Sequence, residues 1–309
     1  MRFARLSSLA LALVVANAVP AAAGINVIAS IKPVHSLVAA VMQGIGEPRL
    51  IVDGAGSPHT FALKPSQAVM LQDADVVFWV GHDLEAFLEK PLETAGSRAK
   101  SVSLLDAPGI VKLAPREGAD FEKHDGHDDG SVHAHGRLDT HVWLDPVNAK
   151  AMLGEIRDTL VAADPDNAAA YQANAGKAMA NLDALTAGVE KELEPVSARR
   201  FIVFHDAYHY FEARFGVSAA ASLTLSPDVM PGAARIRDIR AKVRQLGATC
   251  IFAEPQFEPR LVATITEGTS ARTGVLDPLG AGIPAGPGLY PQLIRTMAKA
   301  LRDCLSSAM

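Results

Sequence analysis

Short apolar runs alternate with helical patterns along most of this 309-residue chain. Apolar runs bounded by turn residues are typical of buried strands, and apolar residues three and four apart are typical of amphipathic helices. Strands that alternate with helices pair in parallel, so the pattern predicts an α/β fold with mainly parallel sheets. The expected strands are 26–30, 50–52, 75–80, 141–144, 201–205, 249–253 and 275–277, and the expected helices include 34–42, 66–72, 148–162 and 233–245.

The longest helical pattern lies in the middle of the chain, with α/β patterns on both sides. It begins at Asp164-Pro165, an N-cap residue followed by proline at the first helical position, and it stops at Pro195. A helix over 165–194 is about 45 Å long, enough to run the height of two domains. An ordinary long core helix is the alternative. We expect an N-terminal lobe over 24–163, a connecting helix over 164–194 and a C-terminal lobe over 195–309.

The first 23 residues have the pattern of a secretory signal peptide. Arg2 and Arg5 form a positive start, residues 9–19 are apolar but too few to span a membrane, and Ala21 to Ala23 give a small-residue cleavage site. We expect a mature chain that begins near Gly24, has no lipid anchor and works in a bacterial periplasm. Its net charge, −5 before cleavage and about −7 without the two arginines, argues against a nucleic acid or an anionic membrane as partner.

The sequence contains two cysteines, Cys250 and Cys304. In an oxidising compartment an even pair is most simply a disulfide. Cys250 precedes the apolar run 251–253, and Cys304 ends an apolar pattern of helical spacing, so the bridge would fasten the last helix to a strand. Two free buried thiols are the alternative.

Five of the ten histidines lie in or directly after the histidine-rich run, which we define as residues 120–138. Imidazoles and carboxylates at this density, with glycines between them, predict a flexible ligand for divalent metal ions. A loop that is only rich in histidine is the alternative. We expect a mobile accessory site of low affinity, with His124, His127, His133 and His135 as its ligands.

Four residues that are far apart in the sequence lie at strand ends or turns. His59 follows a turn rich in glycine and proline, His205 and Asp277 end strands, and His141 begins one. Ligands of parallel α/β sheets bind beyond the carboxyl ends of the strands, and three imidazoles with one carboxylate suit zinc. The spacing does not prove a site, because it contains no short metal-binding motif. For each histidine alone, a hydrogen-bonded structural role is the alternative.

Six motifs follow one another in a fixed order along the chain. They are Ser57-Pro58-His59, Leu63-Lys64-Pro65-Ser66, His141 to Pro146, Phe204 to Tyr208, Phe252 to Gln256 and Leu276 to Gly280. Together they resemble the periplasmic zinc-binding proteins of ABC importers, the ZnuA type, over the whole mature chain. The resemblance implies two α/β lobes joined by a long helix, with zinc held in the cleft between them.

The resemblance also assigns residues. The metal-binding histidines of the family match His59, His141 and His205. Asp277 matches the carboxylate that serves as fourth ligand in related manganese and zinc binders. In zinc members, water or another carboxylate can take its place. The cysteine pair resembles the disulfide of the zinc subgroup. Related manganese binders carry glutamate at the position of His205, and nitrogen there favours zinc over the harder Mn²⁺, although affinity order alone admits Cu²⁺ and Ni²⁺.

The remaining histidines have simpler interpretations. We expect His35, His82 and His209 to serve in helix capping or packing, with His209 close enough to His205 to act behind the ligands. Glu254, at the end of a strand, either orients a ligand or hydrogen-bonds to a turn.

The sequence therefore predicts a periplasmic receptor that captures Zn²⁺, delivers it to an inner-membrane ABC permease and catalyses nothing. We expect a monomer. Two other classes remain open. A zinc-dependent hydrolase would also present three ligands and an open position, but no general base stands in a recognisable motif. In a periplasmic metal buffer or an adhesion protein, the histidine-rich run would be the working part.

Overall fold

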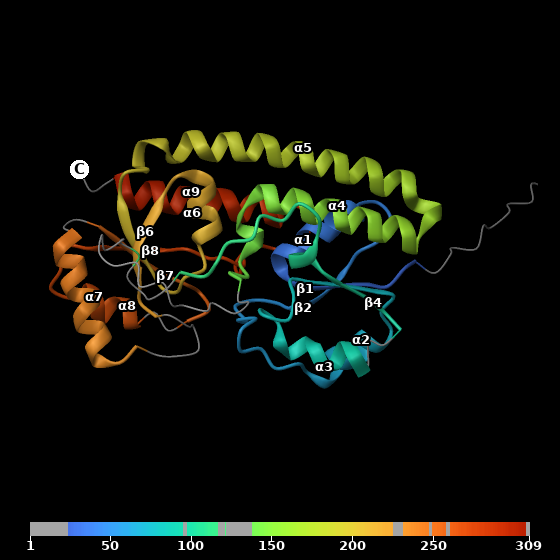
Figure 1. Cartoon of the computed structure of the whole chain (residues 1–309), viewed down its shortest axis with the longest axis horizontal. Coiled ribbons are helices and arrows are strands. Elements are labelled where there is room, and N and C mark those ends of the chain that lie inside the picture. The colour runs from blue at the N-terminus through green and yellow to red at the C-terminus, as the bar shows by residue number, and fades with distance from the viewer. Residues whose placement is uncertain are drawn as a thin grey trace, which may run out of the picture.

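The computed structural model describes residues 24–94, 98–116, 121, 138–224, 231–246, 249–257 and 260–306. The expected signal peptide and the four histidines of the histidine-rich run lie outside these residues. Within them the chain folds into two α/β lobes beneath one long helix (Figure 1). None of the helices described is long and apolar enough to cross a membrane.

The N-terminal lobe is built on a four-stranded parallel sheet. Its strands are β1 (Val27–Ile31), β2 (Arg49–Val52), β3 (Val76–Trp79) and β4 (Lys100–Ser103), in the order β2-β1-β3-β4. Its helices are α1 (Lys32–Val41), α2 (Pro65–Gln72), α3 (Ala86–Thr94) and α4 (Pro146–Ala163). The central strand β1 is buried along its whole length, which explains why its sequence VIASI is nearly all apolar instead of alternating.

The C-terminal lobe repeats this topology. Its strands are β5 (Arg200–Val203), β6 (Ser218–Ser222), β7 (Cys250–Ala253) and β8 (Arg272–Val275), in the order β6-β5-β7-β8 and again parallel. Its helices are α6 (His209–Phe215), α7 (Ala233–Leu246), α8 (Arg260–Thr266) and α9 (Leu289–Ser306). In both sheets the first strand lies between the second and the third. This order places a crevice at the carboxyl ends of the two central strands.

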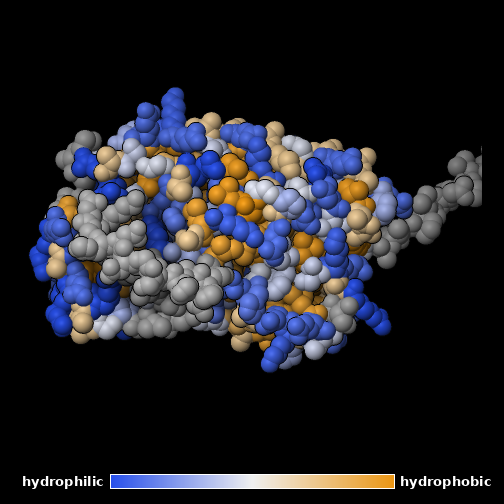
Figure 2. Space-filling view, in the orientation of Figure 1, coloured by the Kyte–Doolittle hydropathy of each residue, from blue (hydrophilic) through white to orange (hydrophobic). Residues whose placement is uncertain are grey.

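The long helix α5 (Ala168–Leu193) has 26 residues, about 39 Å at the usual rise, and runs above both lobes (Figure 1). Its buried residues, among them Tyr171, Leu182 and Leu193, belong to one hydrophobic core that also contains residues of both sheets. Figure 2 shows hydrophilic residues along much of the described outer surface on this side, with hydrophobic residues gathered below α5 toward the middle of the molecule. Since the lobes share a core, α5 restricts their relative movement.

Most expected elements are confirmed to within a few residues, but the expected strand 141–144 is wrong. Val142–Leu144 form a 3-10 turn in front of α4. Asp145 caps that helix, because its side chain accepts a hydrogen bond from the backbone N–H of Val147 at 2.8 Å, and Pro146 occupies the first helical position. The apolar run is buried by packing of this turn, which periodicity alone cannot distinguish from a strand.

The expected strand 275–277 is also misplaced, since β8 ends at Val275. Strands β4 and β6 and helices α6 and α8 were not expected. The sequence of β4, KSVS, is mostly polar and that of β6, SAAAS, consists of small residues, so neither has the apolar signature of a strand. The two-lobed fold with a long helix is confirmed, and the lobe boundaries given above remain our division of the chain.

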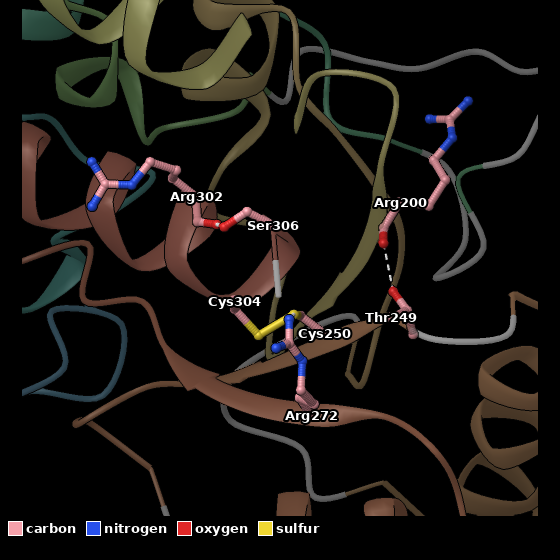
Figure 3. Close-up of a disulfide and its surroundings, with 7 residues drawn as sticks. All are labelled: Arg200, Thr249, Cys250, Arg272, Arg302, Cys304 and Ser306. Atoms are coloured by element: carbon pink, nitrogen blue, oxygen red, sulfur yellow. Dashed lines mark hydrogen bonds between the residues drawn. A yellow bond between two sulfur atoms is a disulfide. The ribbon is translucent and has the colours of Figure 1, made fainter. Parts of the chain in front are cut away.

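The cysteines form a disulfide, with an S–S distance of 2.05 Å across a sequence separation of 54 residues. Figure 3 shows that the bridge joins the end of α9 to the start of β7, with Arg272 beside it. Beside Cys250, the hydroxyl of Thr249 donates to the carbonyl of Arg200 at 2.5 Å, which ties β7 to β5. The disulfide therefore fastens the last helix to a central strand, as expected.

Replacing both cysteines with serine should lower the free energy of unfolding by about 4 kcal/mol, because the unfolded chain regains the entropy of a loop of this length. Urea denaturation of the double variant measures the change, and reduced wild-type protein should show the same loss. Equal stability of the oxidised, reduced and serine forms would contradict it.

Candidate metal centre

Three histidines from three distant segments converge between the lobes. His59 lies in the turn between β2 and α2, His141 directly precedes the 3-10 turn before α4, and His205 lies two residues after β5. Their ligand atoms lie within 4.8 Å of one another, and their ring centroids are 5.3 to 5.7 Å apart. The structure therefore brings together the three predicted histidines.

His141 is buried and held by a carboxylate. Its Nδ1 lies 2.8 Å from Oδ1 of Asp139, which also accepts the backbone N–H of His141 at 3.0 Å. With Asp139 ionised, Nδ1 carries the proton and Nε2 keeps its lone pair. That Nε2 is buried and has no hydrogen-bond partner, as expected of a metal-binding atom in a metal-free site.

His205 is held in the same way from the other lobe. Its Nδ1 lies 2.8 Å from Oε1 of Glu254, which directly follows β7, and its Nε2 is also buried without a partner. Because β5 and β7 are neighbours, His205 and Glu254 meet in the crevice of the C-terminal sheet. Burial disfavours the charged imidazole, but the carboxylates of Glu254, Asp206 and Asp139 together outweigh it, so the pKa of His205 is raised above its ordinary value of 6.5.

His59 is the most exposed of the three histidines. It stands on a turn whose first bend has Gly54 at φ +66°, a conformation that favours glycine. Burial first, and then the imidazoles of His141 and His205, lower the pKa of His59 to about 2. The side chain is therefore neutral at pH 7 and can act as a ligand. Besides the histidines, the small pocket is lined by Ser57, Pro58, Trp143, Glu254, Gln256, Phe257, Pro278 and Leu279.

Asp277 is not part of this group. Its Oδ1 accepts hydrogen bonds from Nε2 of Gln256 at 2.9 Å and from the backbone N–H groups of Leu279 and Gly280 at 3.0 Å. Its Oδ2 accepts the N–H of Ala281 at 2.6 Å. The carboxylate thus organises the turn after β8, and its role as fourth ligand stays a prediction.

Asp139 is the site residue that sequence reasoning missed. It belongs to a run of acidic residues, and only its place two residues before His141 could have pointed to it. Its Oδ2 also lies 3.8 Å from Nδ1 of His209, which places His209 behind the ligands. Glu254 holds the ring of His205, the arrangement that its first expected role requires. His35 contacts the carbonyl of Pro48 at 2.9 Å, a packing role as expected.

Three imidazoles that face one small pocket, two of them backed by carboxylates, make a site for a borderline metal ion such as zinc. Two α/β lobes around such a site, joined by a long helix, define a solute-binding protein for a divalent metal ion.

Comparison with known proteins gives the family. The family model described as ZnuA, zinc-uptake complex component A, periplasmic, matches residues 27–304, and the chain belongs to this family. The high-affinity zinc uptake system protein ZnuA of Brucella suis biovar 1 (strain 1330) is 52% identical over 306 residues, which cover 91% of this chain and 92% of that protein. Its counterpart in Paracoccus denitrificans (strain Pd 1222) is 39% identical over 98% of this chain and 99% of that protein.

Solved structures with the same two-lobed fold include zinc-binding proteins. A crystal structure of ZnuA has a TM-score of 0.77 at 25% identity and covers 91% of this chain and 99% of that chain. The periplasmic zinc-binding protein TroA from Treponema pallidum, with a TM-score of 0.76 at 18% identity, covers 91% and 99% and shows the fold alone. The resemblance noted from the motifs is confirmed. Members of this family are components of a zinc uptake system, not enzymes. The hydrolase alternative is therefore not favoured.

The low pKa of His59 predicts how the metal-free protein responds to acid. Below pH 6.5 the unfolded chain takes up a proton at residue 59 that the folded chain excludes, so stability falls as the pH drops toward 2. We expect a loss of up to about 1 kcal/mol per pH unit, after allowance for solvent at the exposed edge of the ring. Chemical denaturation between pH 7 and 4 should show a shallower decline for His59→Gln, and identical slopes would refute the assignment.

Proposed function

We propose that this chain captures one Zn²⁺ ion in the periplasm with His59, His141 and His205 and delivers it to the permease of an ABC importer. The proposal rests on the unpartnered Nε2 atoms of His141 and His205. In a chain of the zinc-uptake family, two buried histidines each offer an unpartnered Nε2 and are held by a carboxylate at Nδ1. The relatives named above are zinc uptake proteins, in agreement with this cargo.

The charges of the site suit a divalent ion. Three neutral imidazoles leave the charge of a buried Zn²⁺ uncompensated, which would oppose binding. Asp139 and Glu254, with side chains 5% and 1% exposed, supply two negative charges directly behind two of the ligands. Zinc prefers four ligands, so Asp277, water or another carboxylate completes the set. Nitrogen at the position of His205 favours Zn²⁺ over Mn²⁺.

Hydrogen bonds between the lobes bear on delivery. The ammonium of Lys32, at the start of α1, donates to the carbonyls of Ala281 at 3.0 Å and Ile283 at 2.7 Å in the C-terminal lobe. Trp143 donates to the carbonyl of Pro278 at 2.8 Å. Together with α5, these contacts favour a small movement of the lobes on release over a wide hinge opening. We further propose that the protein is a monomer and that residues 24–163 and 195–309 act as the two lobes.

Replacing His59, His141 or His205 with alanine should weaken zinc binding by more than about 100-fold, since each loses a ligand. Deleting residues 122–136 should change the tight site little and remove only weaker sites. Isothermal titration calorimetry of the mature chain measures both. Loss of tight binding in the deletion, with intact binding in the single variants, would transfer the function to the histidine-rich run and favour a metal buffer.

Zinc affinity should fall as the pH drops through the raised pKa of His205, because a proton then competes for the imidazole. Glu254→Gln removes the carboxylate that raises this pKa, so the decline should move to lower pH. Competition titrations with a chelator between pH 8 and 5 give the midpoint. His82→Gln, an exposed histidine beside Glu89 and outside the site, should keep the wild-type profile; a midpoint unchanged by Glu254→Gln would contradict the role of Glu254.

A further inference from the structure

A part-buried arginine pairs with the residue that follows His205. Arg116 donates from Nε to both carboxylate oxygens of Asp206 at 3.0 Å, and its Nη2 also binds Oδ1. Its Nη1 and Nη2 donate to Glu212 on α6 at 2.8 and 2.9 Å. One guanidinium thus pairs with two carboxylates, and we call Arg116, Asp206 and Glu212 the arginine clamp.

The arginine clamp is shielded from water. Its side chains are 16%, 16% and 5% exposed, in the order in which they are named above. The ring of Phe121 covers the guanidinium at 3.7 Å, and the backbone N–H of Phe121 donates to the carbonyl of Ala220 on β6 at 2.9 Å. A cation in such surroundings holds its carboxylates more firmly than an exposed ion pair does.

Asp206 directly follows the ligand His205. The backbone N–H of Ala207 donates to the carbonyl of His205 at 2.9 Å, which closes a tight turn with Asp206 at its centre. The turn is therefore held on both sides. Glu254 fixes the imidazole of His205, and Arg116 fixes the residue after it.

The segment that carries Arg116 connects the two lobes. At its start, Val111 exchanges two backbone hydrogen bonds with the side chain of Asn148 on α4, at 2.8 and 3.1 Å. Leu113 then accepts the N–H of Asp139, the partner of His141, at 3.0 Å, and donates to the hydroxyl of Tyr210 on α6 at 2.9 Å. The segment thus contacts the residues that hold one ligand and ends on the turn that holds another.

We propose that Arg116 is a positioning residue of the metal site. It fixes the turn of His205 relative to His141, so that the ligand nitrogens converge before the metal ion arrives. The inference rests on the proposed function and adds to it a residue that contacts neither the metal nor a ligand side chain.

The test compares Arg116→Met and Asp206→Asn with a matched control. Arg214, on α6, makes a similar bidentate pair with Asp145 at 2.7 and 2.8 Å, also between the lobes, but Asp145 is not adjacent to a ligand. Arg116→Met and Asp206→Asn should each weaken zinc 10- to 100-fold, as for groups that orient ligands, whereas Arg214→Met should change it less than about threefold. The double variant should bind no more weakly than the worse single variant, because both changes remove the same ion pair between Arg116 and Asp206.

Cobalt gives a readout that lost stability alone would not move. The visible absorption of bound Co²⁺ should change in Arg116→Met and Asp206→Asn and match wild type in Arg214→Met, and Arg116→Lys should restore it in part. If Arg116→Met does not fold, the near-isosteric Asp206→Asn decides. Equal losses in all three variants, or a wild-type cobalt spectrum in Asp206→Asn, would overturn the positioning role.

Zinc titrations distinguish failure of the proposed function from failure of the positioning role of Arg116. If the wild-type chain binds zinc as tightly as His205→Ala, the histidine site is not the receptor site, and the role of Arg116 falls with it. If His205→Ala loses tight binding while Arg116→Met equals Arg214→Met, only the positioning role is wrong.

Discussion

The hydrogen bonds from His141 to Asp139 and from His205 to Glu254 are the interactions on which the site depends. Each fixes the ring, directs the free Nε2 toward the pocket and places a negative charge behind the metal position. Without them, two buried imidazoles could rotate and a divalent charge would lie uncompensated between apolar walls. The two lobes and the long helix bring the ligand atoms of three histidines from segments far apart in the chain to within 4.8 Å of one another.

Parallel topology makes this convergence possible. In a sheet of order β6-β5-β7-β8, the chain leaves β5 and β7 at adjacent points of the same edge, although 49 residues separate His205 from Glu254. The N-terminal lobe repeats the order, and His59 arrives from the turn after β2. A shared core under α5 holds the two edges toward each other, and the disulfide fastens α9 to β7 on the side of α5. A ligand set assembled in this way does not need the short spacing of a zinc finger.

Sequence reasoning found the features that local chemistry determines. Buried parallel strands such as β1 are runs of apolar residues, and the 26-residue helix has unbroken apolar spacing, so both were predictable. Strands β4 and β6 were not, because polar and small residues form them through pairing alone. His59 and His205 were found through turn and strand-end positions and a family resemblance, whereas His141, whose expected strand is a 3-10 turn, was found through the resemblance. Asp139 and Arg116 were not, since their roles depend on partners that only the folded chain provides: Arg116 and Asp206 are 90 residues apart.

The carboxylate of Glu254 also affects the charge balance of the site when zinc is absent. Glu254 is almost fully buried, and its charge needs a counter-charge whether or not a metal ion is present. The pKa of His205 is raised above its ordinary value by neighbouring carboxylates despite burial, whereas burial and the neighbouring imidazoles lower the pKa of His59 to about 2. If the site acts as proposed, zinc and a proton compete for His205, and a proton returns to the Glu254–His205 pair when zinc leaves. On the proposed function, cargo exchange is coupled to proton exchange at His205, while His59 from the other lobe stays neutral over the same pH range.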